Sequence, residues 1–421
     1  MLLKKKEELE MAAPSMPVLS KSAAANNPDD QMTPVVWLNE VFMEAVRLGA
    51  SDIHIIPEKD YLSVKFRING VIAEVARWDI DYHDMVMSRI KVISGLQVVE
   101  KNIPQDGHLE LLFELPSHDT TSAKEFNFRV STMPTINGEA AVLRALNKEG
   151  SLLRIDEMGL SEKALLSVKK ILRRGHGILL MTGHTGSGKT TTLYSALNYL
   201  NATDKAILTI EDPVEYRVAN IRQSQVNLAT GYTFGIGLKA LLRQDPDVIM
   251  IGEIRDEETA GIAMRLALVG RLVLTTLHTN SISGALVRMT DMDISKSIVA
   301  SAFIGIIAER LVKKICEKCR IESVPPYELM KMFDISWPEG VKVYAGQGCD
   351  ACDHSGYKGR VGIFEVLEID DDFRNMIIQQ VSGNVLDEYV KSHVVETLRD
   401  DGFDKVRRGI TTLEEVIQVT I

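Results

Sequence analysis

The spacing of apolar residues predicts a mixed domain in the first third of the chain. Residues 35–48 carry apolar side chains at helical intervals and precede Gly49, which predicts a helix. A second helix is predicted at about 82–95, and Asn69-Gly70 predicts a hairpin turn. Strands are predicted at 51–56, 62–68, 71–75, 125–130 and 140–144. Together these elements predict an N-terminal α+β domain over residues 33–150.

A different pattern of apolar residues begins near residue 160, where short apolar runs alternate with helical segments. The runs lie at 178–181, 206–210, 248–251 and 272–276. This alternation is typical of a parallel sheet with crossover helices, so an α/β core is predicted over 151–295. From residue 296 to 421 the pattern predicts a region of polar helices that also holds all four cysteines.

Composition limits the classes of protein to consider. Residues 1–32 are rich in Ala, Ser, Asn and Pro over most of their length, which predicts a flexible N-terminal tail. The net charge of −10 argues against a protein that coats nucleic acid, so no nucleic-acid partner is expected.

No run approaches the roughly 18 apolar residues of a membrane span, and charges occupy the place of a signal peptide's apolar core. The expected location is the cytoplasm, with any membrane association through partners.

One segment predicts a nucleotide site. Gly183-His-Thr-Gly-Ser-Gly-Lys189-Thr190 fits the pattern G-x-x-x-x-G-K-[ST] and lies between a predicted strand and a predicted helix. Its glycines allow backbone N–H groups to turn toward a phosphate, Lys189 can reach the terminal phosphates, and the Thr190 hydroxyl can bind Mg²⁺. The predicted nucleotide-binding residues are Gly183, Thr185, Gly186, Ser187, Gly188, Lys189, Thr190 and Thr191.

Acidic side chains close two of the later strands. Glu211 and Asp212 follow the run at 206–210, and Glu253 follows the run at 248–251. Hydrolysis of a nucleotide requires carboxylates that hold Mg²⁺ and act on the attacking water, and strand ends beside a phosphate loop suit both tasks. The alternative is that they are solvated charges at strand ends. His278 closes a fourth strand, where a structural histidine is an equally good interpretation.

The four cysteines form two C-x-x-C pairs, Cys316/Cys319 and Cys349/Cys352, separated by twenty-nine residues. In a reducing cytoplasm this pattern predicts a closed, structural Cys₄ zinc site rather than disulfides. Four unrelated core cysteines are the alternative. His354 lies just beyond the second pair and is a possible competing ligand.

Four segments, in chain order, resemble the assembly ATPases of type II secretion and type IV pilus systems. Residues 185–194 resemble the Walker A segment of that family, 210–216 its aspartate box, 242–256 its Walker B region and 276–280 its histidine box. The resemblance extends over roughly 35–370. It implies a RecA-like P-loop core and a PAS-like N-terminal domain. It also implies a homo-hexameric ATPase that works through an inner-membrane platform protein, peripheral at the cytoplasmic face of the inner membrane, to assemble a pilus or pseudopilus.

The resemblance also implies residue roles. Lys189 and Thr190 would bind phosphate and Mg²⁺, Glu253 would be the Walker B carboxylate that shares the Mg²⁺, and Glu211 would be the general base. His278 would sense the terminal phosphate. The cofactors implied are therefore ATP, Mg²⁺ and, at the cysteines, Zn²⁺.

Two arginines of the N-terminal domain, Arg129 and Arg144, match positions that the family places against the nucleotide. Without the resemblance, a surface salt bridge would be the ordinary interpretation of each. Their expected role is to stabilise charge on the transferring phosphoryl group.

The chain also departs from the family pattern. Arg271 stands where the family usually has a histidine, and no long extra N-terminal domain of the kind many secretion members carry is expected. The cysteine pairs favour the assembly or secretion branch over retraction motors, which lack them. Two alternatives remain: a nucleic-acid-translocating ATPase and a ring subunit that does not hydrolyse ATP.

Overall fold

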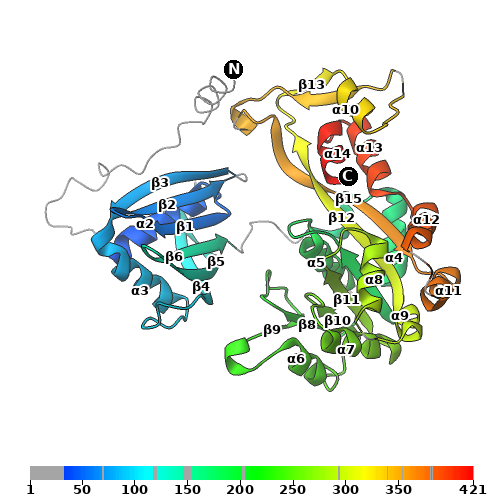
Figure 1. Cartoon of the computed structure of the whole chain (residues 1–421), viewed down its shortest axis with the longest axis horizontal. Coiled ribbons are helices and arrows are strands. Elements are labelled where there is room, and N and C mark those ends of the chain that lie inside the picture. The colour runs from blue at the N-terminus through cyan, green and yellow to red at the C-terminus, as the bar shows by residue number, and fades with distance from the viewer. Residues whose placement is uncertain are drawn as a thin grey trace. The chain divides into compact units, whose positions relative to one another are not determined.

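The computed structural model describes most of the chain and divides it into two compact units, Met1–Glu149 and Gly150–Ile421 (Figure 1). The described residues are 33–68, 71–116, 121–145, 153–201, 204–292, 294–338, 340–352, 354–379, 381 and 383–420. The predicted tail over 1–32 and the Asn69-Gly70 turn lie outside them. Within the described part, no helix is long and apolar enough to cross a membrane.

The N-terminal unit contains a six-stranded antiparallel sheet with the order β3-β2-β1-β6-β5-β4. Its strands are β1 (Asp52–Pro57), β2 (Tyr61–Ile68), β3 (Val71–Asp79), β4 (Gln105–Pro116), β5 (Thr121–Thr135) and β6 (Gly138–Ala145). Its helices are α2 (Pro34–Arg47), the 3₁₀ turn η2 (Ile80–Tyr82) and α3 (His83–Ile93). Ile68 pairs with Val71, so β2 and β3 flank the two-residue connection that the sequence predicts.

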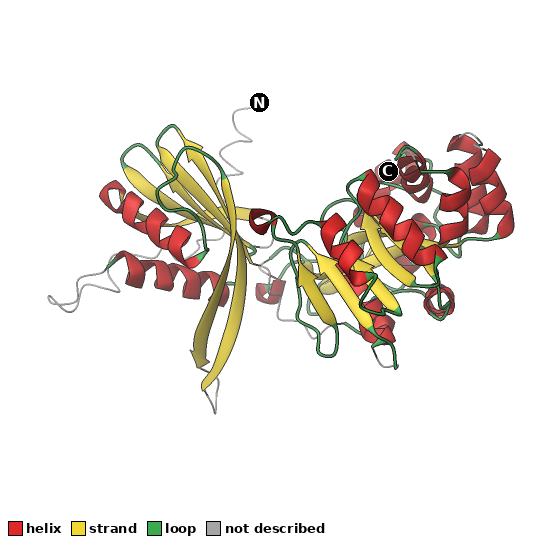
Figure 2. Ribbon diagram, turned by 90° about the horizontal axis from the view of Figure 1, so that it is seen from below, coloured by secondary structure: helices red, strands yellow, loops and turns green. Residues whose placement is uncertain are grey.

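Helices α2 and α3 lie against the sheet of this unit (Figure 2), and their apolar side chains share one core with the strands. Helix α2 begins where the Thr33 hydroxyl accepts a hydrogen bond from the Val36 N–H, and Pro34 occupies the first turn, where its missing N–H costs nothing. Trp37, Leu38, Val41, Phe42 and Ala45 form one buried stripe of α2 and share a core with α3 and the strands. The amphipathic helix predicted at 35–48 is therefore confirmed.

The second unit is an α/β fold built on a seven-stranded sheet with the order β15-β12-β7-β11-β10-β8-β9. Only β15 runs antiparallel to its neighbour. The strands are β7 (Gly177–Thr182), β8 (Ile207–Glu211), β9 (Arg222–Gln225), β10 (Val248–Ile251), β11 (Leu272–Leu277), β12 (Phe303–Ile315) and β15 (Tyr357–Glu368). A separate two-stranded sheet pairs β13 (Arg320–Ser323) with β14 (Val343–Gly346).

Helices cover both faces of the large sheet. Every residue of β7 is buried; Ile178 and Leu180 join one core cluster, whereas Leu179 and Met181 join the other. One cluster includes side chains of α6, α7, α8, α9, α11 and α12, and the other includes those of α4 and α5. The helices are α4 (Glu162–Leu172), α5 (Lys189–Leu200), α6 (Phe234–Leu241), α7 (Glu257–Leu268), α8 (Ile282–Thr290), α9 (Lys296–Ala302), α10 (Tyr327–Met332), α11 (Asp371–Gln379), α12 (Gly383–His393), α13 (Leu398–Arg407) and α14 (Leu413–Thr420).

The prediction of polar helices after residue 296 did not include β12 and β15. The first half of β12 pairs in parallel with β7, and most of its length pairs antiparallel with β15. Its apolar start, residues 303–308, is buried throughout. A short run of this kind cannot be assigned to a strand or a buried helix by periodicity alone, because every position is apolar. The C-terminal region therefore adds two strands to the sheet of the α/β core.

A buried ion pair joins α3 to β6 in the N-terminal unit. The Lys91 amine lies 2.6 Å from a carboxylate oxygen of Glu139, and both side chains are at most 5% exposed. The same amine donates a second hydrogen bond to the Glu100 carbonyl at 2.6 Å. Removal of one buried partner leaves the other charge without compensation.

We predict that Glu139→Ala lowers the free energy of unfolding of the N-terminal unit by about 3–5 kcal/mol. The double variant Lys91→Met/Glu139→Leu should recover most of that loss, because it leaves no unpaired charge. Urea unfolding in a Trp337→Phe background measures this unit through its two tryptophans, Trp37 and Trp78.

The exposed pair of Lys101 and Asp84, whose charged atoms are 3.0 Å apart, provides the control. Asp84→Ala should cost at most about 1 kcal/mol, because solvent screens the pair. A loss in Glu139→Ala no larger than in Asp84→Ala would contradict the prediction.

Candidate nucleotide site and metal centre

Four neighbouring strands of the α/β sheet bring the predicted residues to one edge. Strands β7, β11, β10 and β8 run parallel, so their carboxyl ends meet there. Gly183 and His278 directly follow β7 and β11, Glu211 is the last residue of β8, and Glu253 lies just beyond β10. Residues from four separate parts of the sequence therefore border one edge of the sheet.

The loop between β7 and α5 requires glycine at defined points. Gly186 has φ +80° and Gly188 has φ +108°, both in the left-handed region that side chains disfavour. Gly188 also caps α5, and a Cβ atom there would overlap the carboxylate of Glu309 on β12. The loop can therefore pack directly against the neighbouring strand only because this position has no side chain.

Lys189 is buried and folds back on its own loop. Its amine donates to the carbonyl oxygens of Gly183 at 2.6 Å and His184 at 2.9 Å, and lies 3.5 Å from Nδ1 of His278. Burial lowers the pKa of Lys189 to about 8, although the nearby Glu309 opposes the shift. A bound phosphate would raise this pKa again by supplying an anion beside the amine.

Glu253 and His278 join Lys189 in one group. The Nε2 atom of His278 lies 3.2 Å from a Glu253 oxygen, and its Nδ1 faces the lysine. The other Glu253 oxygen accepts a hydrogen bond from Arg255, which also donates to Asp212 at 3.2 Å. The structure thus gathers three of the predicted residues, Lys189, Glu253 and His278, into one cluster beside the phosphate loop.

Glu211 has a different set of partners. Its buried carboxylate accepts hydrogen bonds from the Tyr194 hydroxyl, from Thr209 Oγ1 at 2.6 Å and from Gln223 Nε2 at 3.1 Å. Burial raises the pKa of Glu211, and these three donors oppose the rise. In this arrangement the carboxylate is directed toward Tyr194 and Gln223 rather than toward the Lys189 cluster.

The remaining loop residues differ in exposure. Thr185 and Thr190 are exposed, Thr191 is half-buried, and Ser187 is buried. The Ser187 hydroxyl has no hydrogen-bond partner among the described residues. The exposed side chain of Thr190, in the first turn of α5, is open to an incoming ligand.

Sequence reasoning missed a buried acidic residue of this site, Glu309. The carboxyl group is 1% exposed, and Oε2 accepts a hydrogen bond from Thr192 Oγ1 at 2.8 Å. Next to it, the Arg310 guanidinium donates to the carbonyl of Asn280 at 2.5 Å. The sequence does show two adjacent charged residues, Glu309 and Arg310, within a largely apolar segment, which is unusual enough to mark them as candidates. Their position beside the phosphate loop, however, depends on the pairing of β12 with β7 and cannot be found from the sequence.

The two predicted arginines of the N-terminal unit lie in one row across its sheet. Arg129 on β5 is paired directly opposite Arg144 on β6, and Arg144 opposite Asp52 on β1, so all three share a face. Arg144 Nε donates to Asp52 at 2.8 Å, and Arg67 on β2 lies 3.4 Å from the same carboxylate. Burial would raise the pKa of Asp52, but the hydrogen bonds and charges of its neighbours hold it below the usual value.

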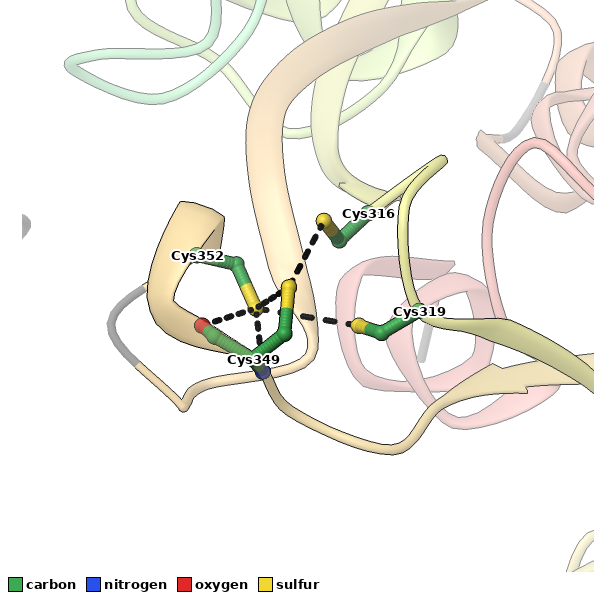
Figure 3. Close-up of side chains that lie close together, drawn as sticks. All are labelled: Cys316, Cys319, Cys349 and Cys352. Carbon is green, nitrogen blue, oxygen red and sulfur yellow. Dashed lines mark hydrogen bonds between the residues drawn. The ribbon is translucent and has the colours of Figure 1, made fainter.

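The four cysteine sulfurs form a compact group (Figure 3). All lie within 4.8 Å of one another, with separations of 3.9 Å for Cys316–Cys349, 3.7 Å for Cys319–Cys352 and 3.8 Å for Cys349–Cys352. A tetrahedral site with Zn–S bonds of about 2.3 Å has sulfur–sulfur edges of about 3.8 Å. The cysteines are free thiols, and the donor set and its spacing fit a metal such as zinc.

His354 is outside this group, because its exposed side chain lies 3.3 Å from Asp350 instead. The four cysteines lie at one end of the antiparallel pair formed by β12 and β15. There Ile315 pairs with Tyr357, and the Cys316 N–H donates to the carbonyl of the adjacent Gly356. A metal there would hold the ends of the two strands together.

Comparison with known proteins now decides the family. The Type II/IV secretion system protein family matches residues 27–418. The chain belongs to this family. The Type II secretion system ATPase E of Vibrio cholerae is 41% identical over 392 residues, which cover 93% of this chain and 76% of that protein.

Two further similar proteins support the same assignment. The type IV pilus assembly ATPase PilB of Thermus thermophilus is 39% identical over 99% of this chain, which spans 45% of that protein. The crystal structure of the pilus retraction motor PilT with bound ADP matches with a TM-score of 0.63 and 26% identity, covering 90% of this chain and 96% of that one. The predicted family and α/β fold class are confirmed.

We predict that the purified protein holds about one zinc ion per chain and that Cys319→Ser/Cys352→Ser loses it. The variant should also unfold at a lower temperature, because binding energy at a structural site contributes to folding. Elemental analysis together with calorimetry measures both effects. His354→Ala should keep the metal and the unfolding temperature of the wild type. Metal loss in His354→Ala, or none in the cysteine variant, would contradict this assignment.

Proposed function

We propose that this chain hydrolyses ATP to drive assembly of a type IV pilus or a type II secretion pseudopilus. As a secretion ATPase of the type II/IV family, it would act as a homo-hexamer on an inner-membrane platform protein, at the cytoplasmic face of that membrane. The observation that carries the proposal is the cluster of Lys189, Glu253 and His278 directly beside the phosphate loop.

The phosphate-binding step follows from the position of Lys189. Its amine donates hydrogen bonds to the carbonyl oxygens of Gly183 and His184, and the terminal phosphates of ATP would replace these two acceptors. Thr190 and Glu253 supply hydroxyl and carboxylate oxygens, the donors that Mg²⁺ prefers, and would hold that ion. When bound, Mg²⁺ neutralises charge on the phosphate oxygens.

His278 suits the role of phosphate sensor, because one ring nitrogen faces Lys189 and the other faces Glu253. Movement of Lys189 toward a phosphate would remove its contact with the ring and leave the contact between the ring and Glu253. The ring can therefore register whether the phosphate position is filled.

Glu211 is proposed as the general base. Burial raises its pKa, which makes the carboxylate a stronger proton acceptor. Before it can act on water, its carboxylate must exchange at least one of the present donors, Tyr194, Thr209 or Gln223, for that water. Repositioning of Glu211 is therefore part of the proposed cycle.

We predict that Glu253→Gln lowers the rate of ATP hydrolysis by at least about 100-fold, since it removes the charge proposed to hold the metal. Affinity for ADP without Mg²⁺ should change little, because phosphate contacts remain. Phosphate release and binding of a fluorescent ADP analogue measure the two effects. Glu257→Gln, an exposed residue in the first turn of α7, is the matched control. Wild-type turnover in Glu253→Gln would refute this role, and turnover stimulated by DNA would favour nucleic-acid translocation.

We also predict that Arg144→Ala and Arg129→Ala each lower turnover, by up to about 10³-fold if they contact the transferring phosphoryl group. Arg144→Lys should recover little, because an ammonium does not reproduce the guanidinium fork. Arg47→Ala, which removes an exposed arginine paired with Glu44, is the control. Unchanged turnover in both variants, measured by phosphate release, would leave these arginines as surface ion pairs.

A further inference from the structure

The phosphate loop rests on a buried carboxyl group that the proposed mechanism does not use. Glu309 lies on β12, and its Oε2 accepts the Thr192 hydroxyl at 2.8 Å from the first turn of α5. Its Oε1 is buried without a hydrogen-bond partner among the described residues. A Cβ atom at Gly188 would overlap this Oε1, and one at Gly183 would lie 2.6 Å from the Glu309 carbonyl oxygen. Glu309 therefore contacts both ends of the loop from the strand beside it.

Two opposing effects act on the charge of this carboxyl group. Burial raises the pKa of Glu309 to about 8, while the hydrogen bond from Thr192 and the charge of Lys189 oppose the rise. Thr192 and Lys189, both on α5, are the groups whose effects favour the anion. Near neutral pH the acid is therefore mostly protonated.

The other charged groups nearby face different partners. On β12 itself, the Arg310 guanidinium donates to two backbone carbonyls, that of Glu309 at 3.0 Å and that of Asn280 at 2.5 Å, and Glu365 on β15 is the acid whose charge acts on that arginine. At the ends of β10 and β11, Glu253 and His278 face each other and Lys189. Among the described residues, Lys189 is the cation whose charge acts on the Glu309 carboxyl.

Nucleotide binding changes this balance in one direction. A polyphosphate brings several negative charges to the loop and draws the Lys189 ammonium toward them. A carboxylate anion buried immediately behind Gly188 would repel those phosphates across a region of low dielectric constant. The neutral carboxylic acid has no such repulsion and keeps the contact with Thr192.

We propose that Glu309 positions the phosphate loop as a neutral carboxylic acid, and that nucleotide binding weakens when this group loses its proton. This inference rests on the proposed nucleotide site. Below pH 8 the free protein already carries the proton, so binding is insensitive to this group. Above pH 8 binding must take up a proton, and affinity falls by up to about tenfold per pH unit.

The test is the dissociation constant of a fluorescent ADP analogue with Mg²⁺, measured on the full chain between pH 7.5 and 9.5. In Glu309→Gln the neutral amide cannot ionise, so the ratio of the wild-type constant to the variant constant should rise roughly tenfold or more over this range. Lys189 also loses its proton there, but in both proteins. Removal of the Glu309 charge would make Lys189 lose its proton earlier, which moves the ratio the opposite way.

A second variant keeps Glu309 and changes only its hydrogen bond. Thr192→Val removes the donor to Oε2, so the anion becomes less favourable and the loss of affinity should begin at higher pH than in the wild type. A purely structural role for Glu309 would not produce this shift. The same measurement therefore decides the question if Glu309→Gln does not fold.

A ratio that stays constant or falls with pH overturns the inference, as does a Thr192→Val profile that is unchanged or displaced to lower pH. If the wild type binds no nucleotide at any pH, the proposed function itself fails. The two failures are therefore distinguishable.

Discussion

The parallel pairing of β7 with β11 on one side and β12 on the other is the constraint on which the site depends. It places the end of β7, and therefore Gly183, between the strand that leads to His278 and the strand that carries Glu309. Because β10 and β8 continue the same parallel register, Glu253 and Glu211 follow at the same edge. Backbone hydrogen bonding therefore sets the order of the chemical groups along this edge.

This arrangement puts the loop between two sets of ionisable side chains. On one side lies the cluster of Lys189, Glu253 and His278, and behind it lies the buried acid Glu309. The low dielectric environment that strengthens phosphate binding also makes an unpaired buried charge expensive, so it shifts the pKa of Lys189 down and that of Glu309 up. Near neutral pH this leaves Glu309 mostly neutral and Lys189 mostly protonated, so the lysine keeps the charge that a phosphate requires.

Local features could be predicted from the sequence, whereas features created by pairing between distant segments could not. The phosphate loop and the strands that end at Glu211 and Glu253 follow from short-range patterns, and the cysteine spacing anticipates the sulfur cluster. Glu309 was missed because the apolar start of β12 cannot be assigned to a strand or a buried helix from its pattern, and only the pairing of β12 with β7 brings this residue to the loop. Likewise, the sequence does not show that Tyr194 holds Glu211, because that contact needs α5 to pack over the sheet.

The metal centre and the nucleotide site share one strand. After its pairing with β7 ends, β12 continues to Ile315, and over this part its partner in the large sheet is β15. A small apolar cluster that includes Val312 and Ile363 packs against this part of the two strands. Cys316 follows directly, so a metal bound by the four cysteines would hold the far end of the same strand whose earlier part carries Glu309. A paired strand resists bending within its sheet better than a free one, because its backbone hydrogen bonds fix its register. The cysteine site can thus support the phosphate loop without touching it.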